Sequence, residues 1–224
     1  SGIVVVRYKI ASVASAKATG GNISTFGTKT IHVFTTSGDF NNTTGAPLSV
    51  DVVMVGGGGA GGGKGAGSSR AGGGGAGGYL FTPGSTVSPG PNTVTIGGGA
   101  TSVDSGMGNN GSNTTFNSLT AYGGGGGGGN ANTDGRHGGS GGGAANTGSG
   151  TSPGGNGNKI TGSNSGIPAP MSPQGNPGGD SYDESGYGGG GGGGAGAAGG
   201  DFNNPPNTAG SGGVGVQIPP AFRN

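Results

Sequence analysis

Short runs of β-branched and aromatic residues alternate with glycine along the chain. Residues 49–55 form one such run and lead directly into the glycines at 56–59. Residues 29–36 alternate between polar and apolar side chains, which is typical of a half-buried strand. Nowhere do apolar residues recur at helical spacing over ten or more positions. The pattern predicts a fold that is mostly β and irregular, with short strands and essentially no α-helix.

Glycine accounts for 67 of the 224 residues and forms seven runs of three or more, the longest at 123–129 and 188–194. A glycine loses the most backbone entropy on folding and adds no side chain to a core. A glycine run can, however, form the extended three-fold helix known as polyglycine II, whose N–H and C=O groups must pair with neighbouring segments. We therefore expect a bundle of polyglycine II helices, with the short strands forming a separate β layer.

The connections between these elements are rich in turn-forming residues. The longest such stretch, residues 144–187, contains five prolines together with many Asn, Ser and Gly residues. This composition predicts a loop. Because loops on a rigid scaffold commonly carry binding residues, we expect any recognition to occur at loops collected at the ends of the bundle.

The two ends of the chain resemble each other. Residues 2–6 read Gly-Ile-Val-Val-Val, and residues 213–216 read Gly-Val-Gly-Val. Tandem copies in a longer protein would explain the similarity, and chance agreement between two β-branched strands is the alternative. On the tandem interpretation, residues 1–28 are the closing strand of a preceding repeat plus a linker, 29–218 form the glycine-rich domain, and 219–224 are an exit segment.

Charged residues are few and balanced, with nine Lys plus Arg against eight Asp plus Glu. Such a chain lacks the basic stripe that nucleic-acid binding requires. It contains no cysteine, which excludes disulfides and thiolate metal sites. No apolar stretch approaches the ~20 residues of a membrane span, so we expect no membrane insertion.

Residues 50–64 contain a candidate nucleotide-binding motif. A β-branched run is followed by residues 58–64, which fit both G-x-x-x-x-G-K and G-x-G-x-x-G. Both motifs require a helix immediately afterwards, but the next residues are Gly-Ala-Gly-Ser-Ser-Arg, and Gly65 stands where the phosphate loop has Ser or Thr. Since glycine is so abundant, chance explains the match. We expect no cofactor.

No arrangement of residues indicates catalysis. His32 and His137 are far apart in the sequence and have no cysteine partner, so we expect no metal site. An enzyme acting on polysaccharide would need clustered carboxylates on β elements, whereas the carboxylates here are few and mostly in predicted loops. The sequence therefore favours a non-enzymatic protein.

Six residues in polar segments are candidates for contact with a receptor. The segment 180–184 holds three of the eight carboxylates and is either a receptor-contacting loop, a calcium site or simply a solvated turn. Aromatic residues beside glycine runs either cover the ends of the bundle or offer a platform for sugar. The candidates are Arg136, His137, Tyr182, Asp183, Glu184 and Phe202.

The order of residues 29–40, followed by the strand at 49–55 and its entry into glycine at 56–59, resembles the glycine-rich domain of bacteriophage tail-fibre and other virion proteins. The resemblance implies a polyglycine II bundle with β elements. It also implies an extracellular location on a virion surface and host recognition by loops at the tip of the bundle. Implied partners are a bacterial surface glycan or outer-membrane protein and other virion fibre chains, with homo-oligomerisation possible.

We therefore expect a non-enzymatic virion component, a phage tail-fibre or adhesin domain that takes part in recognising the host-cell surface. The alternative is a purely structural glycine-rich repeat of an extracellular fibre that has no receptor of its own.

Overall fold

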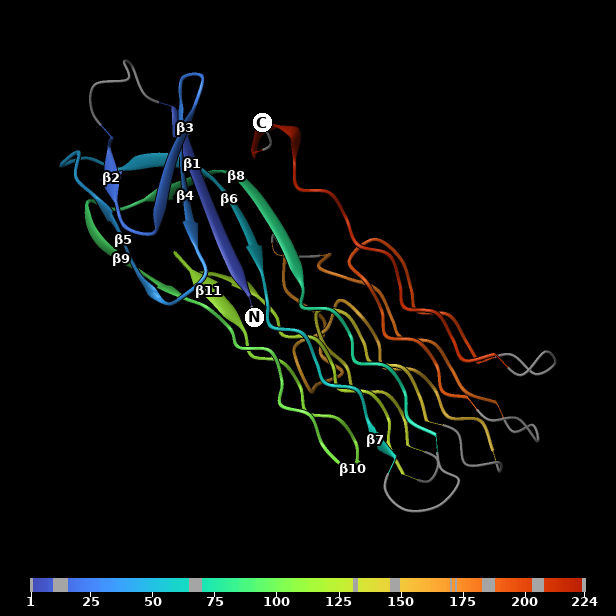
Figure 1. Ribbon diagram of the computed structural model, residues 1–224. Coiled ribbons are helices and arrows are strands. Elements are labelled where there is room, and N and C mark those ends of the chain that lie inside the picture. The colour runs from blue at the N-terminus through green and yellow to red at the C-terminus, as the bar shows by residue number, and fades with distance from the viewer. Residues whose placement is uncertain are drawn as a thin grey trace.

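The computed structural model describes residues 2–9, 16–64, 70–130, 133–145, 150–169, 171, 173–182, 188–202 and 208–222. Within these residues the molecule has a β half and a glycine half, arranged end to end along one long axis (Figure 1). The described residues contain one helical element, the 3-10 turn η1 (Pro220–Phe222). The prediction of a mostly β fold with essentially no α-helix is confirmed.

Two five-stranded antiparallel sheets make up the β half. The first has the order β3 (Asn22–Phe26), β4 (Lys29–Phe34), β1 (Ile3–Lys9), β6 (Leu48–Val55) and β8 (Tyr79–Val87). The second has the order β12 (Leu119–Ala121), β11 (Thr114–Phe116), β9 (Gly90–Thr95), β5 (Gly38–Asn42) and β2 (Ala18–Thr19). A separate short pair, β7 (Gly63–Lys64) and β10 (Ser105–Gly106), lies at the other end of the molecule (Figure 1).

The strand β1 occupies the centre of the first sheet. Val5 lies opposite Val33 of β4 on one side and Val53 of β6 on the other. Residues 3–9 are therefore part of the same unit as β4 and β6, and the predicted boundary after residue 28 does not separate two structural units. The proposed origin of these residues in a preceding repeat stays a prediction.

The main hydrophobic core lies between the two sheets. Alternate residues of β1 (Val4, Val6 and Tyr8) point into it, as the two-residue period of a strand requires. Phe40 of β5 is fully buried, and its ring meets those of Tyr8, His32 and Phe116 edge-on. Each large apolar side chain buried in this way contributes about 1.5–3 kcal/mol.

His32 is the polar centre of this core and is fully buried. Its Nδ1 lies 2.7 Å from the carbonyl oxygen of Gly20, which can only accept, so Nδ1 carries the proton. The Tyr8 hydroxyl accepts the N–H of Ala18 at 3.0 Å and donates to His32 Nε2 at 3.1 Å. Burial lowers the pKa of His32, which keeps the ring neutral, although the bond to Gly20 acts in the opposite direction.

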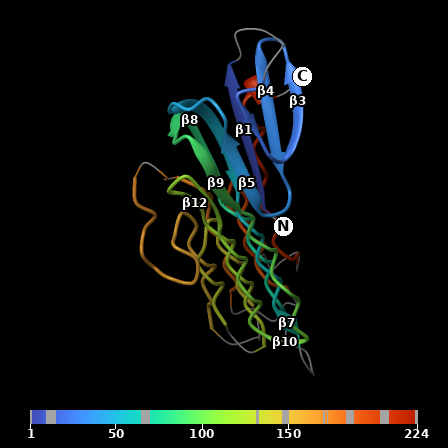
Figure 2. The ribbon, with the colours of Figure 1, turned by 90° about the vertical axis from the view of Figure 1, so that its left-hand side faces the viewer.

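The outer face of the first sheet is covered by the last described residues. Phe222 of η1 packs with Val5, Ile31 and Val53, and its ring meets that of Phe81 edge-on. The Arg7 guanidinium, which forms an ion pair with Asp51, lies 5.0 Å from the centre of the Phe222 ring. Residues 219–222 of the predicted exit segment therefore return to the β half, as Figure 2 shows for the red end of the ribbon.

The run 123–129 is the central member of the glycine half, and its backbone hydrogen bonds repeat every third residue. Its N–H groups form three rows, each directed at a different neighbour. In the first row, Gly123 and Gly126 donate to the side chains of Asn113 and Asn110, respectively. In the second row, Gly124 and Gly127 donate to the carbonyls of Gly57 and Ala60. In the third row, Gly125 and Gly128 donate to the carbonyls of Ser140 and Gly143. The carbonyls of the run also accept hydrogen bonds at three-residue intervals, from N–H groups of segments 72–75, 108–111 and 136–139.

A three-residue repeat is what an extended helix with three residues per turn requires. It supports the interpretation of these segments as polyglycine II helices, which itself stays a prediction. The segments also lie too close together for side chains. A Cβ atom at Gly126 would lie 1.9 Å from the carbonyl oxygen of Gly108, and one at Gly62 would lie 1.9 Å from that of Gly128.

The prediction of a single loop over residues 144–187 is wrong, because two parts of it belong to the bundle. The N–H of Gly155 donates to Gly142 at 2.7 Å, and the N–H of Gly178 donates to Gly155 at 2.9 Å. The described residues between 159 and 171 form the part that projects from the side of the bundle (orange in Figure 2). Composition does not distinguish the two structures, because Gly- and Pro-rich sequences favour both loops and extended bundle segments.

Candidate functional site

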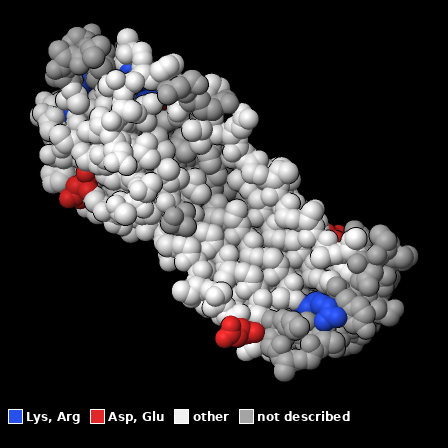
Figure 3. Space-filling view, in the orientation of Figure 1, with Lys and Arg blue, Asp and Glu red and all other residues white. Residues whose placement is uncertain are grey.

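The distal end of the molecule is the end of the glycine half that lies away from the sheets, where β7 and β10 pair (Figure 1). The segment that follows β9, for example, reaches this end at β10 and then turns back toward β11. Figure 3 shows charged side chains on the β half and toward the distal end, with an uncharged stretch of bundle between them on this face. On this face, the charged side chains of the glycine half thus lie toward the distal end.

Tyr182 and two aspartates form a hydrogen-bonded cluster at the distal end. The Tyr182 hydroxyl donates to Asp201 Oδ2 at 3.2 Å, and Asp201 Oδ1 accepts the N–H of Asp180 at 2.8 Å. Asp180 Oδ1 in turn accepts the N–H of Gly154 at 2.8 Å. The Tyr182 side chain is 39% exposed, so the cluster fixes the hydroxyl while leaving the ring accessible.

The carboxylates of this cluster favour the protonated form of the Tyr182 hydroxyl. The negative charge of Asp201 raises the pKa of Tyr182 above its ordinary value, and partial burial and the charge of Asp180 act in the same direction. A neutral phenol beside carboxylates presents an aromatic face and several hydrogen-bond acceptors to solvent. This combination suits a ligand that carries both hydroxyl groups and apolar C–H surface.

Two further candidates of the same segment, Asp183 and Glu184, lie outside the described residues. Asp180 and Asp201 were not among the predicted contact residues. Asp180 belongs to the acidic segment that the sequence singles out, but nothing in the sequence indicates that Asp201, which follows a different glycine run, would join it.

Arg136 and His137 lie part-way along the bundle, apart from Tyr182. The N–H of Arg136 donates to Gly126 at 2.8 Å, and its carbonyl accepts from Gly142 at 2.9 Å. His137 Nδ1 accepts the N–H of Asn156 at 2.8 Å. Both side chains are half-buried. The structure therefore does not bring these two candidates together with the distal cluster.

Phe202 is 1% exposed and does not offer its ring to a ligand in this structure. The ring packs directly on Gly188, where an added Cβ atom would lie 2.3 Å from it. Phe202 thus covers the start of the second long glycine run. The expectation that it belongs to a contact surface is corrected, because glycine leaves an apolar space that the ring fills.

The nucleotide-binding motif at residues 58–64 is part of the bundle. The N–H of Gly59 donates to Gly75 at 2.9 Å, and that of Gly62 donates to Gly72 at 3.0 Å. These amides are therefore already paired.

Among the described residues no three His, Cys, Asp or Glu side chains gather in a group that could hold a metal ion. The same described residues contain no helix that is long and apolar enough to cross a membrane.

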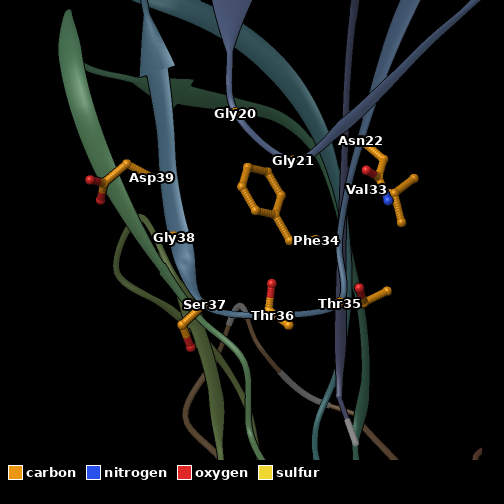
Figure 4. A pocket seen from close by; sticks show the side chains of 10 residues that line it. All are labelled: Gly20, Gly21, Asn22, Val33, Phe34, Thr35, Thr36, Ser37, Gly38 and Asp39. Atoms are coloured by element: carbon orange, nitrogen blue, oxygen red, sulfur yellow. The ribbon is translucent and has the colours of Figure 1, made fainter.

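A shallow cavity of about 210 Å³ lies in the β half, between residues 20–22 and the connection from β4 to β5. Figure 4 shows the Phe34 ring and the Thr36 hydroxyl pointing into it and the Asp39 carboxylate at its edge. Asp39 is the one charged residue among those that line this cavity.

A family model described as a glycine-rich domain matches residues 35–223. A search of the curated proteins finds no significant match. A search of the solved structures likewise finds none. The matched range covers β5, β6, β8 and every described segment of the glycine half. Because the match extends over most of its length, the chain belongs to the glycine-rich domain family.

Proposed function

We propose that this chain is a non-enzymatic surface component of a virion, a tail-fibre or adhesin domain of a bacteriophage that takes part in recognising the host cell. Its location would then be extracellular, on the virion surface. The β half would anchor the domain, and the distal end would meet the host.

One observation carries this proposal. Tyr182 stands exposed at the distal end of a hydrogen-bonded bundle and is held in place by Asp201. An exposed aromatic ring flanked by carboxylates suits a bacterial surface glycan, because the ring covers C–H faces and the carboxylates accept from sugar hydroxyls. An outer-membrane protein is the other class of receptor. Weak contacts of this kind gain strength when several copies bind together.

The test is binding of fluorescently labelled protein, presented on multivalent beads, to a panel of bacterial strains and to their purified surface polysaccharides. Tyr182→Ala is expected to weaken binding by about tenfold or more, as for an aromatic residue central to an interface. Phe26→Ala is the matched control, because Phe26 is an aromatic residue that is 50% exposed on β3 in the β half.

Equal binding by both variants would contradict the proposed role of the distal end. Binding to protein-stripped cells but not to polysaccharide-deficient cells would identify the receptor as a glycan, and the reverse result would identify it as an outer-membrane protein.

A structural repeat without its own receptor is the second candidate. The similarity between residues 2–6 and 213–216 favours it, because tandem copies in a longer protein would explain why the two ends resemble each other. Multivalent protein that binds no strain, from a gene that encodes several copies with unchanged distal residues, would favour this alternative.

A further inference from the structure

The second long glycine run, residues 188–194, has one row of N–H groups without partners. Three residues per turn give such a segment three rows of donors and three rows of acceptors. All three acceptor rows are occupied. The carbonyls of Gly190 and Gly193 accept from the N–H groups of Gly73 and Ala76, respectively, and those of Gly191 and Gly194 accept from Gly179 and Asn176. The carbonyls of Gly189 and Gly192 accept from Gly210 and Gly213.

Two of the three donor rows are also occupied. Gly190 and Gly193 donate to Ala144 and Gly141, and Gly191 and Gly194 donate to Gly200 and Ala197. The third row consists of Gly189 and Gly192, and their N–H groups donate to none of the described residues. Both glycines are buried. Buried backbone N–H groups without a partner are rare, because such a group loses its bonds to water and gains none in return.

The missing neighbour corresponds to a groove in the surface. Five segments surround the run 188–194, and between two of them, residues 71–76 and 209–213, lies a cavity of about 460 Å³. A second cavity of about 320 Å³ shares Ala76 and Gly213 with it and extends toward Val55 and Tyr79. Together they form one groove along the bundle, which we call the bundle groove.

The wall of the bundle groove that residues 71–77 form also carries backbone groups without partners among the described residues. The N–H and C=O groups of Gly74 and Gly77 make no hydrogen bond with any described residue, and these two glycines are again three positions apart. The described residues that line the larger cavity are all glycine or alanine. Such a lining offers backbone hydrogen bonds at regular spacing and no charge to a ligand.

From these observations we infer that the bundle groove binds an extended glycine-rich segment of another polypeptide chain, which becomes an additional member of the bundle. In a bound segment with three residues per turn and a rise of about 3.1 Å per residue, every third carbonyl points to the same side. Two such carbonyls of the bound segment would accept from the N–H groups of Gly189 and Gly192. Glycine is required because the existing members approach one another more closely than Cβ atoms allow. The groove binds this segment whichever receptor the distal end recognises.

The first part of the test is amide hydrogen exchange on the full chain, followed by NMR. Gly189 and Gly192 are expected to exchange faster than Gly190, Gly191 and Gly193, whose N–H groups are bonded. Equal protection of all five amides in the protein alone would overturn the inference, because the row would then already have partners.

The second part uses a synthetic peptide of seven glycines flanked by two lysines on each side. Its addition is expected to slow exchange at Gly189 and Gly192 by about tenfold. A peptide with seven serines in place of the glycines is the matched control and is expected to leave both amides unchanged. An equal effect of the two peptides, or no effect of either, would contradict a requirement for glycine.

Two variants test the location of binding. Ala76→Leu adds bulk at an exposed residue that lines both cavities. It is expected to weaken binding of the glycine peptide by about tenfold. Gly98→Val is the control, since a Cβ atom there meets nothing within 4 Å and Gly98 lies outside the groove. Unchanged affinity in Ala76→Leu, or protection of Gly189 and Gly192 by a surface oligosaccharide instead of the peptide, would overturn the inference.

Discussion

In the β half, large side chains fill the space between two sheets, whereas in the glycine half backbone groups of neighbouring segments meet directly. Tyr8, Phe40 and Phe116 have almost no exposed surface and contact one another through their rings. The run 123–129, by contrast, is buried with no side chain of its own, and its amides bond to its neighbours. The two halves are therefore destabilised by opposite changes. The β half loses stability when side-chain atoms are removed, and the glycine half loses stability when side-chain atoms are added.

The largest effect is expected from adding one methyl group at the centre of the bundle. In Gly126→Ala the new Cβ atom would meet the carbonyl oxygen of Gly108 and disturb the bonds from Gly126 to Asn110 and from Arg136 to Gly126. Overpacking together with two disrupted hydrogen bonds is expected to lower the free energy of unfolding by about 5 kcal/mol.

Chemical denaturation measures this loss, and Gly98→Ala is the matched control. Because a Cβ atom at Gly98 meets nothing within 4 Å, that variant is expected to change stability by less than about 1 kcal/mol. Equal stability of the two variants would show that the bundle is loosely packed.

The next largest effect is expected from removing a side chain in the β half. Phe40→Ala deletes a fully buried ring that contacts three other rings, and it is expected to cost about 4 kcal/mol. The same measurement on Phe26→Ala, where the ring is exposed, is expected to show a loss well below that. A small loss in Phe40→Ala would mean that the core collapses to fill the space.

A smaller effect is expected from removing one hydroxyl from the same core. Tyr8→Phe leaves the buried N–H of Ala18 and the ring nitrogen of His32 without their partner, at an expected cost of about 2 kcal/mol. Tyr182→Phe removes a hydroxyl from an exposed side chain and is expected to change stability by less than about 0.5 kcal/mol. Thermal unfolding of the two variants side by side distinguishes them, and an equal loss in both would contradict the central position of Tyr8.

The smallest effect near neutral pH is expected from the protonation of His32. Burial lowers the pKa of His32 below its ordinary value of 6.5, so the unfolded chain binds a proton that the folded chain does not. Stability is therefore highest above pH 6.5 and is expected to fall as the pH drops from there toward the folded-state pKa. Denaturation at a series of pH values measures this dependence. His32→Gln should remove it and His137→Gln should keep it, whereas the opposite pattern would show that His32 is not the group responsible.

Much of the fold could be predicted from local sequence. The alternation at 29–36 gave β4, and the β-branched run at 49–55 gave β6, because a strand that buries one or both faces must place apolar residues at particular positions. The central place of β1 could not be predicted, since pairing between residues 5, 33 and 53 depends on contacts far apart in the chain. The bundle segments within residues 144–187 were missed because their composition is also that of a loop.

The candidate site could be predicted only in part. The acidic segment after residue 179 drew attention to Tyr182, but the bond to Asp201 depends on two glycine segments lying side by side, which no local pattern specifies. The burial of Phe202 and the separation of Arg136 from Tyr182 have the same origin. In a bundle whose members are all rich in glycine, local sequence does not specify which segments become neighbours.

The central claim is that hydrogen bonds between glycine backbones hold the glycine half together, and residue-resolved hydrogen exchange of the full chain tests it most directly. The amides of Gly124, Gly125 and Gly127, which are bonded to two different segments, are expected to be as strongly protected as those of Val52 and Met54 in β6. Exchange of these glycine amides at the rate of an unstructured peptide, while β6 remains protected, would contradict the claim.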